Sequence, residues 1–364
     1  MATFYTLEDV LHPQVVTELY RTETQKVFSH PLIDYYGQQS RNYTGDRFEF
    51  AYREAMKQPA PANVRGQSAR VLQPTGSSPR RVFLLHAFNE ISLSMDALQM
   101  IRRPDDQTTQ EKGQEEIVRQ MEDFGARHHI FRAVCLAKTL ADGVIHFSAD
   151  GQVLESPTGA AYSVDFGVPD SHKGQLDGFG STLINTAWDD PTAKILDHLD
   201  SIRIRAEEEN AEEPRHIWLH HSAKRWLRQN VQMQDFVAGT SEAVDRALRG
   251  TMIEDLAGWT WHFFSGTYQG VAGLQFPYIP RTRAIITPDI GPWLRAVNGS
   301  ELITGVEGIR PTVDGALQDV SEVFGDFAYV KLLDNPTKLV LRMGTNFVYA
   351  FANPLAVWMP TVDF

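Results

Sequence analysis

KGQEEIVRQMEDFGARHHIFRAVCLAKTL, residues 112–140, is the stretch that decides the fold. Six of its residues recur at spacings of three and four, which places one stripe on a single helix face: Ile117, Met121, Phe124, His128, Phe131 and Cys135. At 1.5 Å per residue such a helix would extend roughly 43 Å, well beyond the ~11 or 12 residues of an average globular helix. Turn residues at 104–109 and at Asp142-Gly143 mark its ends. With no catalytic motif near it, the stretch predicts a structural helix.

Composition and charge exclude several classes of protein. The chain has 364 residues, of which 42% are hydrophobic and 22% charged, and this predicts a globular protein of two or three domains. Its formal net charge of -12 argues against tight wrapping around nucleic acid, because phosphate binding needs clustered positive charge. The single cysteine, Cys135, excludes an internal disulfide, fits a reducing compartment and is expected to be a buried packing residue.

We also expect neither a membrane span nor secretion. No stretch approaches the ~18 apolar residues that a membrane helix requires. The first ten residues have neither the basic segment nor the apolar segment of a signal peptide.

The first eighty residues are expected to form an arm and an extended loop. Residues 1–37 carry apolar positions in a helical or arm-like pattern: Leu7, Val10, Leu11, Val15, Val16 and Leu19. Residues 38–81 are polar and rich in Pro, Gly, Ser and Arg, with strand-like stretches at 47–52 and 69–72. Because loops longer than about 12 to 15 residues rarely lack a function, this segment needs a partner to lie on.

The remainder alternates strands and helices, which indicates an α+β or α/β order. Before the long helix we expect a buried strand from residue 82 and a helical turn at 96–103. After it we expect strands at 144–147 and 161–166. A glycine-containing loop at 169–181 then forms the expected domain boundary. All seven tryptophans follow that loop, which suggests a second domain packed around them.

Beyond the loop, the pattern predicts a helix at 192–210, a strand at 216–221 and a capped helix at 222–230. Near the end it predicts paired strands at 338–342 and 346–351 about a turn at Gly344, then a last strand at 354–358.

Candidate chemical sites are weak. The chain has no glycine-rich phosphate loop, nucleophile elbow or His-Glu-x-x-His motif. His216, His220 and His221, in combination with His198 or without it, could ligate zinc. Strand alternation, however, puts His221 on the opposite face, and half-exposed histidines at a strand end are the favoured interpretation. We therefore assign no catalytic, cofactor-binding or metal residues.

Two further pairs have structural interpretations that we prefer. His128 and His129 are expected to be satisfied interior or interface imidazoles. Asp189 and Asp190 could act as paired carboxylates, but Asp-Asp-Pro-Thr is more typical of a turn that caps the following helix.

Opposite charges distinguish the extended loop from the long helix. Residues 41–81 contain eight basic and three acidic side chains, a balance of +5, whereas the beginning of the helix carries five acidic residues (Glu111, Glu115, Glu116, Glu122 and Asp123) against Lys112 and Arg119, a balance of -3. Complementary charge of this kind could steer one subunit onto another. The alternative is a solvated basic loop without a partner.

The order of these segments resembles a known family. An arm, QPAPANVRG at 58–66, HAFNEISLSMDALQMIR at 86–102, the long helix, YSVDFG at 162–167 and then Trp188 are similar to the lambda-type major capsid protein E family of tailed bacteriophages. The resemblance covers nearly the whole chain, through order and spacing rather than any one diagnostic motif.

The resemblance implies an α+β Hong Kong 97-type capsid fold. Its parts would be an N-terminal arm (1–37), an E-loop (38–86), a P-domain (87–184) with a spine helix (112–141), an A-domain (185–335) and C-terminal strands that return to the P-domain (336–364). In this family the E-loop lies across the neighbouring subunit near its spine helix.

The resemblance further implies a major capsid protein that forms the icosahedral shell, built of hexamers and pentamers, of a virion assembled in the bacterial cytoplasm. The expected partners are other copies of the chain, scaffold and decoration proteins, a portal at one vertex and enclosed double-stranded DNA. No cofactor, enzymatic activity or membrane contact is implied. The alternatives are a metal-dependent hydrolase using His216 and His220 with Asp189 or Asp190, and a tail-tube or portal-like phage protein.

Overall fold

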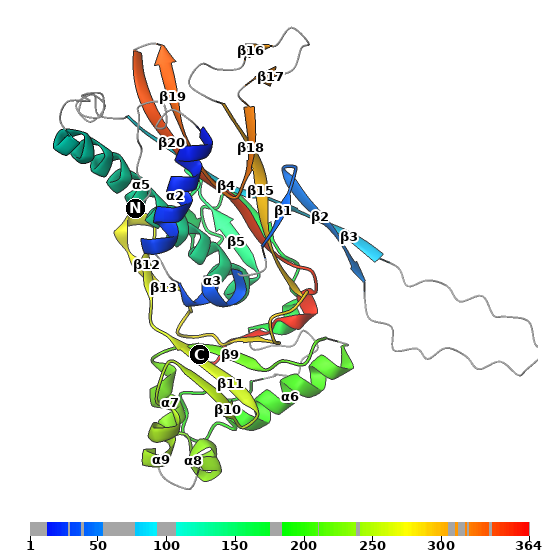
Figure 1. Ribbon diagram of the computed structural model, residues 1–364. Coiled ribbons are helices and arrows are strands. Elements are labelled where there is room, and N and C mark those ends of the chain that lie inside the picture. The colour runs from blue at the N-terminus through cyan, green and yellow to red at the C-terminus, as the bar shows by residue number, and fades with distance from the viewer. Residues whose placement is uncertain are drawn as a thin grey trace, which may run out of the picture. The chain divides into compact units, whose positions relative to one another are not determined.

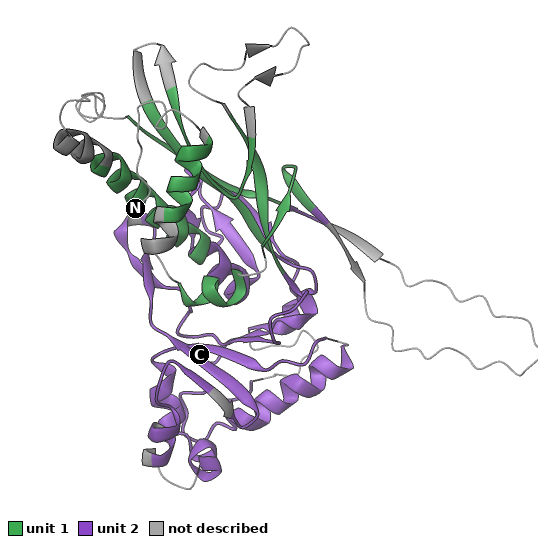
Figure 2. Ribbon diagram, in the orientation of Figure 1, with its two compact units in different colours: residues 1–48, 83–133, 295–349 green, residues 49–82, 134–294, 350–364 purple. Residues whose placement is uncertain are grey.

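The computed structural model describes residues 13–27, 30–37, 40–53, 77–92, 107–174, 184–209, 211–237, 241–304, 310–311, 317–318, 320–334 and 337–363 (Figure 1). Its contacts divide the chain into two compact units (Figure 2). Unit 1 contains residues 1–48, 83–133 and 295–349, and unit 2 contains residues 49–82, 134–294 and 350–364. Both units are therefore assembled from segments far apart in the sequence.

Unit 1 is built on a six-stranded sheet. Its main path runs β1 (Ser40–Tyr43), β15 (Leu294–Thr304), β20 (Thr337–Phe351) and β19 (Asp326–Asp334). β4 (Leu85–Ser92) pairs with β20, and β18 (Val320–Phe324) pairs with β15. Two short pairs lie outside this sheet: β2 (Arg47–Arg53) with β3 (Ser77–Phe83), and β16 (Arg310–Pro311) with β17 (Leu317–Gln318).

The first N-terminal helix and the long helix cover apolar positions of this sheet. Helix α2 (Pro13–Val27) buries Val16, Leu19 and Tyr20 in one cluster with Ile117 and Met121 of α5 (Gln107–Asp142). Four strand residues complete the cluster: Ala328, Val330, Leu341 and Met343. The predicted arm is thus helical where it is described, in α2 and in α3 (Pro31–Tyr36).

The long helix is confirmed and is longer than predicted. It begins at Gln107, five residues before the expected start, and ends at Asp142, where Gly143 adopts a φ of +66° and its N–H donates to the Thr139 carbonyl at 3.1 Å. In the predicted stripe Phe124 and Phe131 are half-buried, and the other four residues are buried. From residue 133 to 141 every residue is buried, so the single-stripe prediction is wrong for the last turns.

Unit 2 is built on a four-stranded sheet in the order β10 (Met252–Leu256), β11 (Trp259–Phe264), β9 (His216–His220) and β14 (Ile285–Thr287). Its helices are α6 (Ile195–Glu208), α7 (Ala223–Gln229), α8 (Val231–Val237) and α9 (Ser241–Ala247). The core contains Trp188, Trp259, Trp261 and Trp358, which agrees with the expected concentration of large aromatics.

Smaller elements complete unit 2. A three-stranded sheet joins β6 (Val153–Leu154), β5 (Val144–Phe147) and β7 (Tyr162–Asp165). Two-stranded pairs are β12 (Thr267–Gln269) with β13 (Gln275–Pro277), and β21 (Met359–Pro360) with β8 (Lys173–Gly174). The 3-10 turns are η2 (Asp170–His172), η3 (Val271–Gly273) and η4 (Pro354–Ala356).

The predicted turn at Gly344 is wrong. Residues 338–351 belong to one continuous strand, β20, which pairs with β19 on one side and β4 on the other. A Cβ on Gly344 would lie 2.4 Å from the Phe327 ring and 2.8 Å from the Ala87 carbonyl oxygen. The glycine therefore admits the close approach of a neighbouring ring and backbone, which is the other role of glycine within a strand.

Three further predictions need correction. Residues 354–356 form a 3-10 turn, because the Asn353 side chain accepts a hydrogen bond from the Leu355 N–H and starts that turn. β4 begins at Leu85, and the expected buried strand is wrong because most of its side chains are exposed and only Leu85 is buried. Ser222 precedes α7 as predicted, but its hydroxyl contacts His220 Nδ1 at 2.8 Å and makes no capping bond.

Some predictions lie outside the described residues. They concern Leu7, Val10 and Leu11 of the arm, the strand-like stretch at 69–72 and the helical turn at 96–103.

Candidate assembly surfaces

The base of the basic loop is an isolated ribbon. β2 pairs with β3, and within the described residues neither strand pairs with another sheet. Arg81 Nε lies 2.7 Å from Glu49 Oε1, and the Arg47 guanidinium lies 4.6 Å from the ring centre of Phe83, a side chain that is 55% exposed. A two-stranded ribbon is marginally stable at best in water. Its exposed aromatic and cationic groups are therefore suited to lie on another surface.

The acidic face of α5 is present and partly neutralised within the helix. Glu116 lies 2.9 Å from Arg119, and Asp123 lies 3.1 Å from Arg127. Arg127 follows the acidic segment 111–123 along the helix. The hydrogen bond from Arg119 lowers the pKa of Glu116. Glu115 is exposed and Glu122 half-buried. Because exposed ion pairs contribute at most about 1 kcal/mol, this face remains available to an incoming cation.

His128 connects α5 to two other elements of unit 1. Its Nδ1 lies 2.6 Å from the Tyr20 hydroxyl on α2, and its Nε2 lies 3.0 Å from Asn89 Nδ2 on β4. Burial, opposed by the nearby Asp326 charge, lowers the pKa of His128 to about 4. The ring is therefore neutral at physiological pH and interior, as predicted for a satisfied histidine.

Arg132, one helical turn beyond His128, joins α5 to the sheet of unit 1. Its Nε donates to Thr345 Oγ1 at 2.7 Å, and a terminal nitrogen lies 3.2 Å from Asp326 Oδ1. The guanidinium also lies 4.9 Å from the ring centre of Phe347. These contacts fix the rotation of α5 about its axis against β19 and β20.

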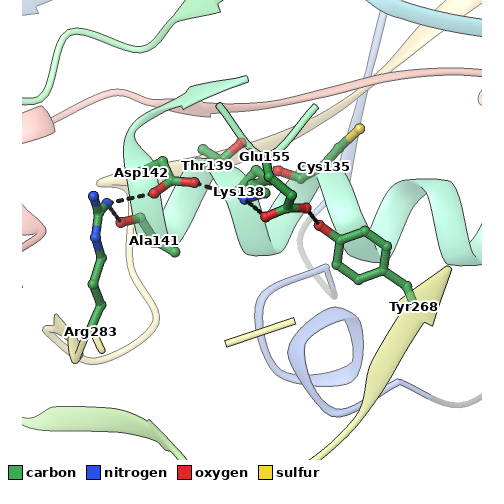
Figure 3. A network of polar contacts seen from close by, with 8 residues as sticks. All are labelled: Cys135, Lys138, Thr139, Ala141, Asp142, Glu155, Tyr268 and Arg283. Atoms are coloured by element: carbon green, nitrogen blue, oxygen red, sulfur yellow. Dashed lines mark hydrogen bonds and ion pairs between the residues drawn. The ribbon is translucent and has the colours of Figure 1, made fainter. Parts of the chain in front are cut away.

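The last turns of α5 carry a charge network in unit 2 around the buried Lys138 (Figure 3). Lys138 Nζ lies 2.6 Å from Glu155 Oε2 and 3.1 Å from Asp142 Oδ2. The Tyr268 hydroxyl donates to the other oxygen of Glu155, and Arg283 donates to Asp142 Oδ1 at 2.5 Å. Burial and the bond to Glu155 raise the pKa of Tyr268, which keeps its proton in this bond.

Sequence reasoning did not identify Lys138 or Arg132. The available signal for Lys138 was a lysine within a nearly continuous apolar stretch, 133–141, because a lysine is almost never fully buried without a partner. The partners themselves are 17 and 130 residues away in the sequence, at Glu155 and, through Glu155, at Tyr268. The spacing of the helix holds no information about them.

The histidines of β9 are buried and engaged. His216 Nε2 lies 2.8 Å from Asp289 Oδ1, and its Nδ1 lies 3.1 Å from His262 Nε2. His216 and His220 are 7% and 9% exposed, so the expected half-exposed position at a strand end is wrong. β9 lies between β11 and β14 in its sheet, so both of its edges are paired. Within the described part of the chain, no cluster of three or more His, Cys, Asp or Glu side chains could hold a metal ion.

The other candidates have structural roles. Asp190 Oδ1 accepts bonds from the Thr192 N–H and hydroxyl, both at 2.7 Å, and these bonds lower the pKa of Asp190. This confirms a turn, although α6 starts only at Ile195. His198 contacts the Trp188 indole and Asn185, away from β9. The Cys135 thiol is buried, and burial raises its pKa.

Comparison with known proteins identifies the family. The model of the family described as phage major capsid protein E matches residues 16–299. The chain belongs to this family. No curated protein matches the chain significantly.

The chain is also similar to several solved structures, of which the first agrees with a phage capsid fold. A protein described as the capsid protein of an Escherichia coli CFT073 prophage is 12% identical, with 95% of this chain and 98% of that chain covered and a TM-score of 0.51. The capsid of Ralstonia phage GP4 is 12% identical, with coverage of 88% and 84% and a TM-score of 0.48. A phage-related protein from Bordetella bronchiseptica RB50 is 10% identical, with coverage of 95% and 97% and a TM-score of 0.47.

Family membership establishes what this phage major capsid protein does. It has the α+β Hong Kong 97-type fold and forms the shell of a virion by self-assembly; it is a structural protein and not an enzyme. The hydrolase alternative based on His216 and His220 has no support. Among the helices that the structure describes, none is both long and apolar enough to cross a bilayer.

Proposed function

We propose that the chain forms hexamers and pentamers of an icosahedral shell that encloses packaged double-stranded DNA of a tailed phage, after assembly in the cytoplasm of the bacterial host. The proposed parts are the arm (1–37), E-loop (38–86), P-domain (87–184) with its spine helix (112–141), A-domain (185–335) and returning C-terminal strands (336–364). A scaffold protein, a decoration protein and a portal at one vertex are proposed partners. Contacts that close into rings, with curvature between rings, produce a closed shell.

The observation that carries this proposal is the ribbon of β2 and β3. It belongs to the segment 41–81, which has a charge balance of +5, and within the described residues neither of its strands pairs with another sheet. The acidic face of α5 has the opposite charge. On this face Glu115 is exposed, while Arg119 pairs with Glu116 and Arg127 with Asp123. The ribbon of one subunit would lie on α5 of its neighbour. Burial of the two surfaces against each other would stabilise the ribbon, which is marginally stable alone.

Reversal of charge in the loop tests this contact. The double variant Arg65→Glu/Arg70→Glu should lower the yield of closed particles at least tenfold, because like charges replace an attraction across the interface. Particle yield is measured by sedimentation and negative-stain imaging, and circular dichroism checks that the subunit still folds. An unchanged yield would count against the contact, and rings or tubes of one symmetry from the wild-type chain would favour a portal or tail-tube protein.

A charge swap is the matched control. Glu115→Lys/Glu122→Lys alone should also impair assembly, whereas the combination of all four changes should recover much of the lost yield. Recovery measures the coupling between the two surfaces and separates a direct contact from general damage. If the quadruple variant assembles no better than either double variant, the two segments do not meet.

A further inference from the structure

The outer face of α6 in unit 2 exposes apolar side chains. Leu196 and Asp200 of α6, Phe236 of α8 and the turn 257–259 line a hollow of about 410 Å³. Phe236 is 54% exposed, and Ile204, one turn beyond Asp200 on the same face, is 59% exposed. A continuous exposed apolar surface marks a site of contact with another molecule. Because this protein assembles into a shell, a second copy of the chain is available to cover the surface.

Negative charge surrounds the exposed isoleucine. Residues 195–213 contain seven acidic and two basic side chains, a balance of -5 that includes both arginines of α6. Asp200, Glu207 and Glu208 are exposed. They lie four residues before Ile204 and three and four residues after it, so all three are neighbours of Ile204 on the helix surface. The face is therefore apolar at its centre and acidic at its rim.

Helix α7 has the opposite charge. It contains Lys224, Arg225 and Arg228 and no acidic residue, a balance of +3. Lys224 Nζ donates to the Leu248 carbonyl at 2.8 Å, whereas Arg225 and Arg228 are exposed and, three residues apart, lie on one side of the helix. Arginine is enriched in protein interfaces, where its apolar stem packs and its charged head reaches a carboxylate.

The two faces lie on different parts of unit 2. Helix α8 contacts both α6 and α7, and the Leu196 N–H donates to the Gln232 side chain of α8 at 2.8 Å. From this point α6 extends over 14 residues, roughly 21 Å, to its acidic end. Figure 1 shows α6 and α7 on opposite sides of β10 and β11. Two different faces that attract each other produce a head-to-tail contact between copies, which closes into a ring when the rotation allows it.

We propose that α7 of one copy lies on the exposed face of α6 of the next copy, in a contact that repeats around each ring. The heads of Arg225 and Arg228 meet the acidic rim, and their apolar stems cover Ile204 and Phe236. The inference rests on the proposed rings of the shell. It adds a contact between copies that does not involve the ribbon of β2 and β3.

A charge swap between the two helices tests the contact. Arg225→Glu/Arg228→Glu should lower the yield of closed shells at least tenfold, with an unchanged circular dichroism spectrum, because repulsion replaces attraction. Asp200→Lys/Glu208→Lys should have the same effect. The combination of all four changes should recover most of the yield, since it restores opposite charges across the contact. A combination that assembles no better than either double variant would overturn the proposal.

A crossed combination is the matched control. It joins Arg225→Glu/Arg228→Glu of α7 to Glu115→Lys/Glu122→Lys of α5, and its total charge change equals that of the swap. It should show no recovery, because α7 and α5 belong to different contacts. Equal recovery in the swap and in the crossed combination would show that assembly responds only to net charge, which would overturn the inference.

Chemical cross-linking identifies the geometry with milder substitutions. Cys135 is buried, so Glu208→Cys/Arg228→Cys introduces the two exposed thiols. A bismaleimide should convert shells of this variant into a ladder of covalent oligomers on a denaturing gel, whereas either single substitution should leave monomers. Absence of a ladder would overturn the proposal, as would dimers from a single substitution, which would show one face meeting itself.

The same experiment separates this inference from the proposed function. Closed shells of the cysteine variant without a ladder would overturn the contact between α6 and α7 and leave the proposed shell intact. Failure of the wild-type chain to form closed shells would overturn both.

Discussion

At the scale of a residue, His128 should make stability depend on pH. Its pKa is about 4 in the folded chain against an ordinary value of 6.5, so between these values the unfolded chain binds more protons. Stability is therefore complete above about pH 6.5 and falls as the pH is lowered towards 4, by up to about 3 kcal/mol from this group. His128→Gln should flatten this part of the curve, measured by denaturant unfolding of the unassembled subunit at several pH values.

For His128→Gln, the slope of the free energy of unfolding against pH is compared with the wild type. The absolute free energy is not compared, because the substitution also disturbs the bonds to Tyr20 and Asn89. His221 is exposed, so His221→Gln should leave the slope as in the wild type. His30 and His262, whose pKa values burial also lowers to about 4, will retain part of the dependence. If His128→Gln has the same slope as the wild type, His128 does not contribute to the pH dependence of stability.

At the scale of an element, the C-terminal end of α5 depends on its buried cation. Lys138→Met should lower the free energy of unfolding by about 3 kcal/mol, because Glu155 and Asp142 lose a common partner while they remain partly buried. The double variant Lys138→Met/Glu155→Gln should lose less than the sum of its single changes, since the amide can still accept from Tyr268. Denaturant unfolding of the subunit measures both.

The matched control for Lys138 is Lys194, which also pairs with an aspartate of its own helix region but is 75% exposed. Lys194→Met should change the free energy of unfolding by no more than about 0.5 kcal/mol. Equal effects of the two substitutions would show that the network in Figure 3 contributes no more than a surface ion pair.

At the scale of the whole molecule, the net charge of -12 should keep the subunit from holding DNA. Non-specific binding of DNA typically has a Kd of about 10⁻⁴ to 10⁻⁶ M and depends on clustered basic residues. We expect no retardation of a short duplex by about 1 µM subunit in physiological salt, measured by gel shift. Saturable binding at that concentration, weakened steeply by added salt, would contradict the prediction that the net charge keeps the subunit from holding DNA.

The sequence by itself determined the features that depend on local spacing. The periodicity of residues 117–135 predicted α5, the Asp142-Gly143 pair predicted its end, and the tryptophans predicted the aromatic core of unit 2. These signals are sufficient because helical period, a left-handed glycine and side-chain size act over a few residues. Charge counts along the chain likewise needed no structure.

Only the tertiary structure decided which distant groups meet. It placed the ring of Phe327 over Gly344, where the sequence suggested a turn, and buried His216 against His262, where the sequence suggested exposure. It also gave Lys138 its partner Glu155 and left Asn346 Oδ1 without one. A glycine, a lysine or an asparagine has the same local pattern in either setting, and its role depends on neighbours that strand pairing brings from elsewhere in the chain.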